Sequence, residues 1–121
     1  YTPTHTLSLH DALPISYGTE RCYNAIRLAQ TMLKQAPDMT LTVFLMADAV
    51  VGARGGQKTP DGYYNLERML RRLAGKATIL LCGTCMDARG MTDADAMEGA
   101  RRSTMDELAE ATRAADKVLV F

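Results

Sequence analysis

The sequence lacks several features that would place it in a class at once. Its 14 Lys and Arg residues balance 14 Asp and Glu residues, so the chain has no excess of charge of one sign. Without such an excess, no long-range field gathers nucleic acid or an anionic membrane surface. No apolar run approaches the roughly 20 residues that a membrane-spanning helix needs, because even LTVFLMADAVV contains Thr42 and Asp48. We therefore expect neither nucleic acid nor a membrane as a partner.

Cysteine is scarce as well, and its number is odd. The three cysteines, Cys22, Cys82 and Cys85, cannot form a disulfide framework without leaving one thiol over. The first residues do not have the pattern of an export signal, since no Lys or Arg stands near the start and Pro14 interrupts the apolar part. We therefore expect a protein of the reducing cytoplasm rather than a disulfide-stapled secreted domain.

The composition that remains is typical of a single folded domain. Hydrophobic residues make up 47% and charged residues 23% of the 121 positions, which is close to the average of globular proteins. A chain of this length can build one hydrophobic core and is too short for two. We therefore expect one domain.

The pattern after residue 16 predicts a helix followed by a buried strand. Thr19 can cap a helix of about four turns, and Pro37 stands beyond its end. The run from Leu41 to Met46 is rich in β-branched and aromatic residues, which favours a strand that is buried on both faces. The apolar residues of the helix keep the spacing of one helical face and are Cys22, Ala25, Ile26, Ala29 and Leu33.

A glycine-rich segment separates this strand from a second helix. GARGGQKTPDGYY, residues 52–64, contains four glycines and should form a mobile surface loop, and loops of this length often carry function. The second helix begins at Leu66, has apolar residues at i, i+3, i+4 and i+7, and ends at Gly75. We expect its water-facing side to carry Arg68, Arg71 and Arg72.

The last part of the chain predicts two strands and one helix. KATILLC, residues 76–82, is a buried strand, and GTCMDARGMT after it is expected to be a turn-rich loop. Ser103 or Thr104 caps a last helix, and KVLVF closes the chain as a strand. The inward face of that helix is expected to carry Met105, Leu108 and Ala115. This order favours an α/β fold with a mainly parallel sheet.

The first sixteen residues differ in kind from the rest. TLSLHDALPIS, residues 6–16, resembles the translation of a common short-read sequencing adapter. We therefore interpret residues 1–16 as a non-native segment and residues 17–121 as the genuine domain, whose first strand is missing or replaced by this stretch. Both histidines, His5 and His10, lie in the segment, so the genuine domain has no imidazole for a Cys-His pair or a zinc site.

Cys82-Gly83-Thr84-Cys85 is the only concentrated chemical signal. A Cys-x-x-Cys pair that ends a buried strand lies at the sheet edge where open α/β proteins bind ligands, with its sulfurs in disulfide reach. A thiol-disulfide couple, a persulfide carrier with a resolving thiol, half of a zinc site and inert buried cysteines all fit the pattern. Zinc needs four ligands and Cys22, on a helix, is the only further cysteine, so we expect no metal.

Charged residues on neighbouring loops can assist a reactive thiol. Arg54, Lys58 and Arg89 lie on loops that can reach the same edge, where a positive side chain helps a thiol to lose its proton. Asp48 follows the first predicted strand, so it caps a turn or lines the pocket. GARGG lacks the Gly-x-x-x-x-Gly-Lys frame of a phosphate-binding loop, and we expect no nucleotide or other cofactor.

Five motifs follow one another through the genuine domain: YGTERCYNAIRLA, LTVFLMADAV, RGGQKTPDGYYNLERML, LCGTCMDARGM and ADKVLVF. Through them, residues 17–121 resemble the DsrE/DsrF-like proteins and most of all their YchN-type branch. The resemblance implies a three-layer α/β/α sandwich, assembly into a trimer or hexamer, and cytoplasmic sulfur relay through a cysteine persulfide. In the relay members the carrier cysteine precedes an Arg-Gly pair, as Cys82 does here, while Cys85 belongs to the pattern of the branch.

These observations lead to three functional hypotheses. The first is a sulfurtransferase-like persulfide carrier that exchanges sulfur with donor and acceptor proteins, in which Cys82 accepts the sulfur and Cys85 resolves it or holds a disulfide. The second is an oligomeric module that binds a small ligand or responds to redox state without turnover. The third is a structural subunit with inert cysteines.

Overall fold

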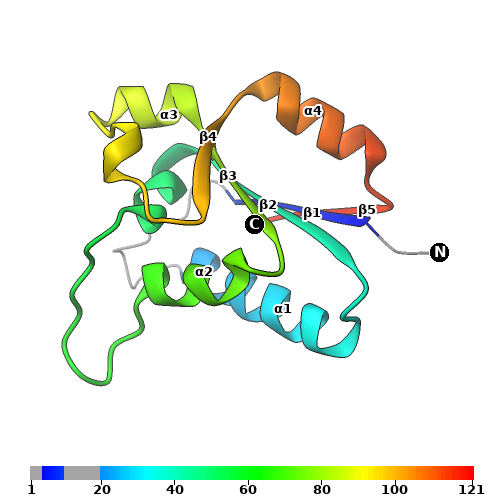
Figure 1. Ribbon diagram of the computed structural model, residues 1–121, viewed down its shortest axis with the longest axis horizontal. Coiled ribbons are helices and arrows are strands. Elements are labelled where there is room, and N and C mark those ends of the chain that lie inside the picture. Colours follow the sequence, from blue (N-terminus) through cyan, green and yellow to red (C-terminus); the bar gives the residue numbers. More distant parts are fainter. Residues whose placement is uncertain (1–3, 10–19) are drawn as a thin grey trace.

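The computed structural model describes residues 4–9 and 20–121, which form a parallel sheet with helices on both faces (Figure 1). The sheet has five strands in the order β4-β3-β2-β1-β5, and every pairing between neighbours is parallel. This confirms the predicted α/β fold. The strands are β1 Thr4–Leu9, β2 Thr40–Leu45, β3 Thr78–Cys82, β4 Ala100–Ser103 and β5 Lys117–Val120. The helices are α1 Arg21–Gln35, α2 Leu66–Ala74, α3 Gly83–Ala88 and α4 Met105–Ala114, with the 3₁₀ helices η1 Ala47–Ala53 and η2 Asp93–Asp95.

β1 lies inside the sheet, between β2 and β5. Its backbone pairs with β2 along six residues and with β5 along four. The N-terminal stretch thus takes the place of a first strand, which is one of the two outcomes that the sequence predicts. The adapter origin of residues 1–16 stays a prediction, and the predicted cap Thr19 lies outside the described residues.

α1 and α2 cover one face of the sheet and bury clear apolar faces (Figure 1). α1 ends before Pro37, with Ala36 as its C-terminal cap, and α2 ends at Gly75. Asn65 begins α2, and its side chain accepts a hydrogen bond of 3.0 Å from the Arg68 N–H. The buried residues of α1 are the five predicted ones, Cys22, Ala25, Ile26, Ala29 and Leu33.

β2 and β3 form the buried centre of the sheet and agree with their predicted ranges within two residues. Both carry consecutive buried residues, which is the pattern of a strand covered on both faces. Their register pairs Leu45 with Leu81. Because the strands are parallel, the segments that follow Leu45 and Cys82 emerge at the same edge of the sheet.

The sequence pattern does not predict β4. Its four residues are ARRS, and only Ser103 is buried. At the edge of the sheet the two arginines are held by carboxylates, since Arg101 pairs with Glu107 at 2.5 Å and Arg102 with Asp93 at 2.6 Å. Hydrophobic periodicity carries no signal for a strand of this kind.

Two predicted loop regions are instead partly helical. Residues 83–88 form α3, which buries Met86 and ends where Gly90 adopts a left-handed φ of 62°. Gly52 and Ala53, predicted at the start of a mobile loop, are the buried last residues of η1. In both regions, packing against the core overrides the turn signals of glycine.

The inward face predicted for α4 is only partly correct. Thr104 does cap this helix, because its hydroxyl accepts a hydrogen bond of 3.2 Å from the Glu107 N–H. However, α4 buries none of its residues, and Met105 is 55% exposed. Of the other two predicted residues, Leu108 is half-buried and packs against the core, and Ala115, the C-terminal cap, is half-buried.

Candidate functional site

Cys82 joins the sheet to α3. It is the last residue of β3 and the N-terminal cap of α3, and only 5% of it is exposed. Burial raises the pKa of the Cys82 thiol, and a hydrogen bond with the Cys85 thiol raises it further. The N–H groups of Thr84 and Cys85 point at the Cys82 sulfur and offset this in part. The two sulfurs therefore lie next to each other, with Cys82 on the inner side.

Gly83 permits this close turn. A Cβ atom built on it would lie 2.9 Å from Nη1 of Arg102 and 3.1 Å from the carbonyl oxygen of Ser103. Both atoms belong to the end of β4. A side chain at residue 83 would therefore displace the Arg102 side chain and crowd the backbone of Ser103, where β4 lies against the start of α3.

Cys85 is the outer member of the pair. It is half-buried in the first turn of α3, and its sulfur accepts a hydrogen bond of 3.1 Å from the Ala47 N–H. Ala47 opens η1 directly after β2 and has a φ of 52°, a left-handed conformation that alanine rarely adopts. The strained backbone after β2 thus directs an N–H group at a sulfur supplied by β3 and α3.

Arg89 and Asp48 form an ion pair beside Cys85. Nε and Nη2 of Arg89 lie 2.9 Å from Oδ1 of Asp48, and Nη1 donates to the carbonyl oxygen of Cys85 at 3.1 Å. Asp48 therefore lines the site from η1. The pair fastens α3 to η1 and sets a guanidinium close to the exposed side of the cysteines.

The structure does not bring Arg54 and Lys58 to this group. Arg54 follows η1, and its guanidinium lies 4.0 Å from the Asp95 carboxylate. Lys58 is exposed on the loop between η1 and α2. Of the four supporting residues that the sequence predicts, only Asp48 and Arg89 lie against the cysteines within residues 20–121.

Arg102 is a supporting residue that the sequence reasoning missed. Its guanidinium donates to the carbonyl oxygen of Gly83 at 3.2 Å and to Asp87 at 3.1 Å, and its Nε donates to Asp93 at 2.6 Å. It thereby holds both ends of α3 to β4. The only sequence signal for Arg102 is the doubled arginine in ARRS. Because the sequence pattern did not predict β4, it could not place this arginine beside α3.

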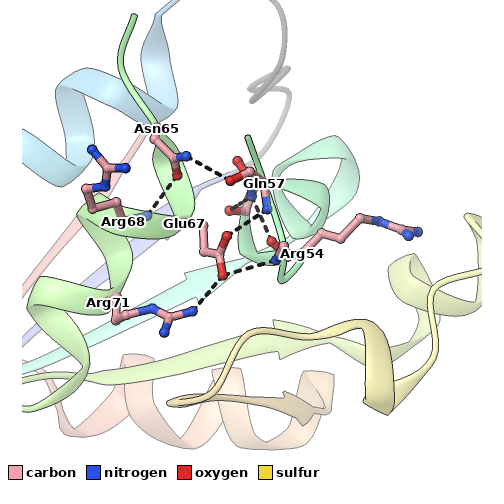
Figure 2. Close-up of polar contacts among 8 residues, drawn as sticks. Arg54, Gln57, Asn65, Glu67, Arg68 and Arg71 are labelled. Carbon is pink, nitrogen blue, oxygen red and sulfur yellow. Dashed lines mark hydrogen bonds and ion pairs between the residues drawn. The ribbon is translucent and has the colours of Figure 1, made fainter. Parts of the chain in front are cut away.

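Glu67 anchors the first part of the loop between η1 and α2 (Figure 2). Its carboxylate accepts hydrogen bonds from the N–H groups of Gly56 and Gln57, at 3.2 and 2.8 Å, and from Arg71 at 2.6 Å. Burial alone would raise the pKa of Glu67, but these donors together lower it. The first part of the loop is therefore anchored to α2 rather than mobile as predicted.

Cys22 has no place in this site. It is 2% exposed in the core-facing side of α1, and burial raises its pKa to about 12. In the part of the chain that the structure describes, no group of three or more His, Cys, Asp or Glu side chains is placed to hold a metal ion. Within the same residues, no helix has the length and apolar character needed to cross a membrane.

The fold and the site together define a class of protein, a small parallel α/β domain with a Cys-x-x-Cys pair at the end of an interior strand. The chain belongs to the DsrE/DsrF-like family, whose sequence profile matches residues 14–121. This confirms the resemblance that the sequence motifs indicate.

Individual relatives support the same assignment. The chain is similar to protein YchN of Escherichia coli, with 42% identity over 106 residues that cover 87% of this chain and 90% of YchN. An uncharacterized protein of Methanocaldococcus jannaschii is 32% identical over 105 residues, with 87% and 90% coverage. The crystal structure of E. coli YchN superposes with a TM-score of 0.91 at 36% identity, covering 99% of this chain and all of that one. A protein of unknown function from Methanobacterium thermoautotrophicum shares the fold, with a TM-score of 0.76 at 12% identity over 97% of this chain and 98% of its own.

Proposed function

We propose that this protein carries sulfur as a persulfide on the pair formed by Cys82 and Cys85. The observation that supports it best is the hydrogen bond of 3.1 Å from the Ala47 N–H to the sulfur of the half-buried Cys85, next to Cys82. An N–H group directed at a sulfur stabilises the negative charge of a thiolate. Membership of a family associated with sulfur relay supports the same chemistry.

The sulfur transfer needs only thiolate chemistry. A cysteine thiolate attacks the outer sulfur of a donor persulfide, R–S–SH, forms Cys–S–SH and releases the donor thiolate RS⁻. An acceptor nucleophile then takes the outer sulfur and regenerates the thiolate. If no acceptor binds, the second cysteine attacks the inner sulfur, which forms the Cys82–Cys85 disulfide and releases HS⁻. A cellular dithiol reduces that disulfide by exchange.

The two cysteines differ in their suitability for the first step. The sequence pattern favours Cys82 as the carrier. The geometry favours Cys85 as the thiol that first meets a donor, because Cys82 is 5% exposed and burial, followed by its hydrogen bond with the Cys85 thiol, raises its pKa. In this scheme sulfur enters on Cys85, and Cys82 is the resolving thiol.

Intact-mass spectrometry after incubation with inorganic polysulfide tests the proposal. We expect a gain of one sulfur atom in Cys82→Ser, which lacks the resolving thiol, and no gain in the double variant Cys82→Ser/Cys85→Ser. The unmodified chain and Cys22→Ser should gain one sulfur atom or, after resolution, lose two hydrogens and release HS⁻. Loss of the adduct in Cys85→Ser with retention in Cys82→Ser places entry on Cys85, and the reverse result places it on Cys82. Absence of an adduct in both single variants, or an equal adduct in the double variant, would disprove sulfur carriage.

A redox-responsive module without turnover is the second candidate. It is favoured by the interaction of the Cys85 thiol with Cys82, which raises the pKa of Cys82, since the two thiols of a Cys-x-x-Cys pair are within disulfide reach. In the same experiment this function gives a loss of two hydrogens from the unmodified pair and no added sulfur in either single variant.

The carrier is further proposed to act as a trimer or hexamer in the cytoplasm. Met105 on α4 is 55% exposed and Val120 on β5 is 60% exposed, which fits a surface that another copy covers. The odd number of cysteines, three, favours a reducing compartment over a disulfide-stapled domain. Sulfur donor and acceptor proteins would then reach the Cys85 edge, which lies at the carboxyl ends of β2 and β3, opposite the end of α1.

A further inference from the structure

A basic groove runs along the seam between α1 and α2, on residues that the sulfur chemistry does not use. Its wider part is a cavity of about 320 Å³ whose lining includes Arg27, Arg68 and Arg72. A second cavity of about 160 Å³ shares Gln30 and Arg72 with the first and extends the groove to Lys76. The described residues that line the two cavities include no Asp or Glu.

Arg68 and Arg72 of the groove differ from Arg71, which lies on the same helix α2. Arg71 is held at 2.6 Å by Glu67. Figure 2 shows the Arg68 side chain directed toward α1 and away from Glu67, while Arg71 turns toward that carboxylate. Within residues 20–121, no carboxylate lies within ion-pair distance of the Arg68 or Arg72 guanidinium. Their positive charge is therefore available to an anion.

The walls of the groove are fixed before any ligand binds. The Tyr23 and Tyr64 rings stack with their centroids 4.4 Å apart, and the Arg27 guanidinium lies 5.3 Å from the Tyr23 centroid. Nε2 of Gln30 on α1 donates to the carbonyl oxygen of Met69 on α2 at 3.3 Å. The Gln30 bond joins α1 to α2, and the tyrosine pair joins α1 to the segment before α2, so the backbone that carries the arginines is held in place, which lowers the entropy cost of binding.

From this arrangement we propose that the α1–α2 groove binds a small organic phosphate. A guanidinium offers parallel N–H donors that match two oxygens of a phosphate group, and three arginines at one cavity provide this from several sides. The larger cavity is at the small end of the size range of metabolite sites, about 300–1,000 Å³. It exceeds what a bare phosphate needs, so it has room for the organic part, and Lys76 can contact a second anionic group.

Isothermal titration calorimetry on the full chain tests this site with adenosine monophosphate, adenosine, pyrophosphate and citrate. We expect adenosine monophosphate to bind with a Kd below about 1 mM, adenosine not to bind, and Arg68→Gln and Arg72→Gln each to weaken binding about tenfold, the usual loss for one charged hydrogen-bond pair. Arg68→Lys should lose less than Arg68→Gln, because it keeps the charge and loses only the planar fork.

Arg113→Gln is the matched control, since it removes the same charge from an exposed position on α4. Equal weakening in Arg113→Gln, or citrate binding as tightly as the phosphates, would show general attraction of anions and overturn the proposal. Failure of both adenosine monophosphate and pyrophosphate to bind at 1 mM would overturn it as well. Unchanged thermal midpoints of the Arg68 and Arg72 variants show that any loss comes from the groove and not from unfolding.

Discussion

The helices on the two faces of the sheet differ in how they are attached. α1 and α2 bury continuous apolar faces, so the hydrophobic effect holds them to the sheet. α4 buries no residue, and its start is held by the Thr104 cap and by the pair between Arg101 and Glu107. The hydrogen bonds from Arg101 and Ser103 lower the pKa of Glu107 to about 2, although the pair is exposed.

Because of this difference, one layer of helices provides most of the stability, and the other carries the groups that meet other molecules. Exposed ion pairs contribute little free energy, about 0–1 kcal/mol each, whereas a buried aliphatic side chain contributes several times more. The α1–α2 layer therefore sets the free energy of unfolding. The α3–α4 layer carries Cys85 and the exposed Met105, and there a substitution should change chemistry or assembly more than folding.

The largest effect should follow from Ile26→Ala in α1. Ile26 is 1% exposed, and truncation of such a side chain costs about 2–5 kcal/mol because it leaves a cavity. Urea unfolding followed by circular dichroism measures this loss. Leu28→Ala is the matched control, since Leu28 lies on the same helix, is 39% exposed, and should cost less than about 1 kcal/mol. Equal losses in the two variants would mean that α1 is not a core helix.

A smaller effect is expected from Glu67→Gln. The amide keeps one acceptor oxygen but loses the charge that binds Arg71 and the Gly56 and Gln57 N–H groups, which should cost about 1–3 kcal/mol. Faster hydrogen exchange at residues 56 and 57 should accompany the loss. Glu110→Gln, at an exposed position of α4, is the control and should change neither quantity.

The cost of Glu67→Gln should depend on pH in a definite direction. Because the pKa of Glu67 is lowered in the folded state, its carboxylate stabilises the fold above the ordinary value of 4.5, and that contribution is lost as the pH falls through the folded pKa. The difference between the unmodified chain and the variant is therefore largest near pH 7 and shrinks on acidification below 4.5. A difference that grows in acid would contradict the assigned hydrogen bonds.

Sequence patterns predicted the well-buried layer better than the exposed one. Apolar spacing predicts the five buried residues of α1 and the buried runs of β2 and β3, because a buried face requires apolar residues at regular intervals. Apolar spacing predicts neither β4 nor the orientation of α4. The ARRS segment is held by carboxylates that are distant in sequence, and α4 has no buried stripe. The local sequence pattern does not show which distant carboxylates pair with the arginines of an edge strand.

The candidate site divides in the same way. The positions of Cys82 and Cys85 at a strand end follow from KATILLC and the glycine after it. The partner of Cys85 is the backbone N–H of Ala47, which any residue type could supply, so the sequence holds no signal for it. The sequence did not show that Arg54 and Lys58 lie away from the cysteines. Both belong to a glycine-rich segment whose anchoring to Glu67 depends on tertiary contacts.

The smallest change in the free energy of unfolding is expected for Met105→Ser in α4. Met105 is 55% exposed, so its removal should cost a protomer less than about 0.5 kcal/mol. If another copy covers this surface, the same variant should dissociate at higher protein concentration than the unmodified chain, while Met105→Leu keeps the apolar contact and the assembly. Sedimentation equilibrium measures the assembly, and urea unfolding of the dissociated protomer measures the fold. A loss of stability as large as that of Ile26→Ala would make α4 a core helix and remove the distinction between the layers. An unchanged assembly in both variants would leave that distinction standing but would place the contact between copies elsewhere on the surface.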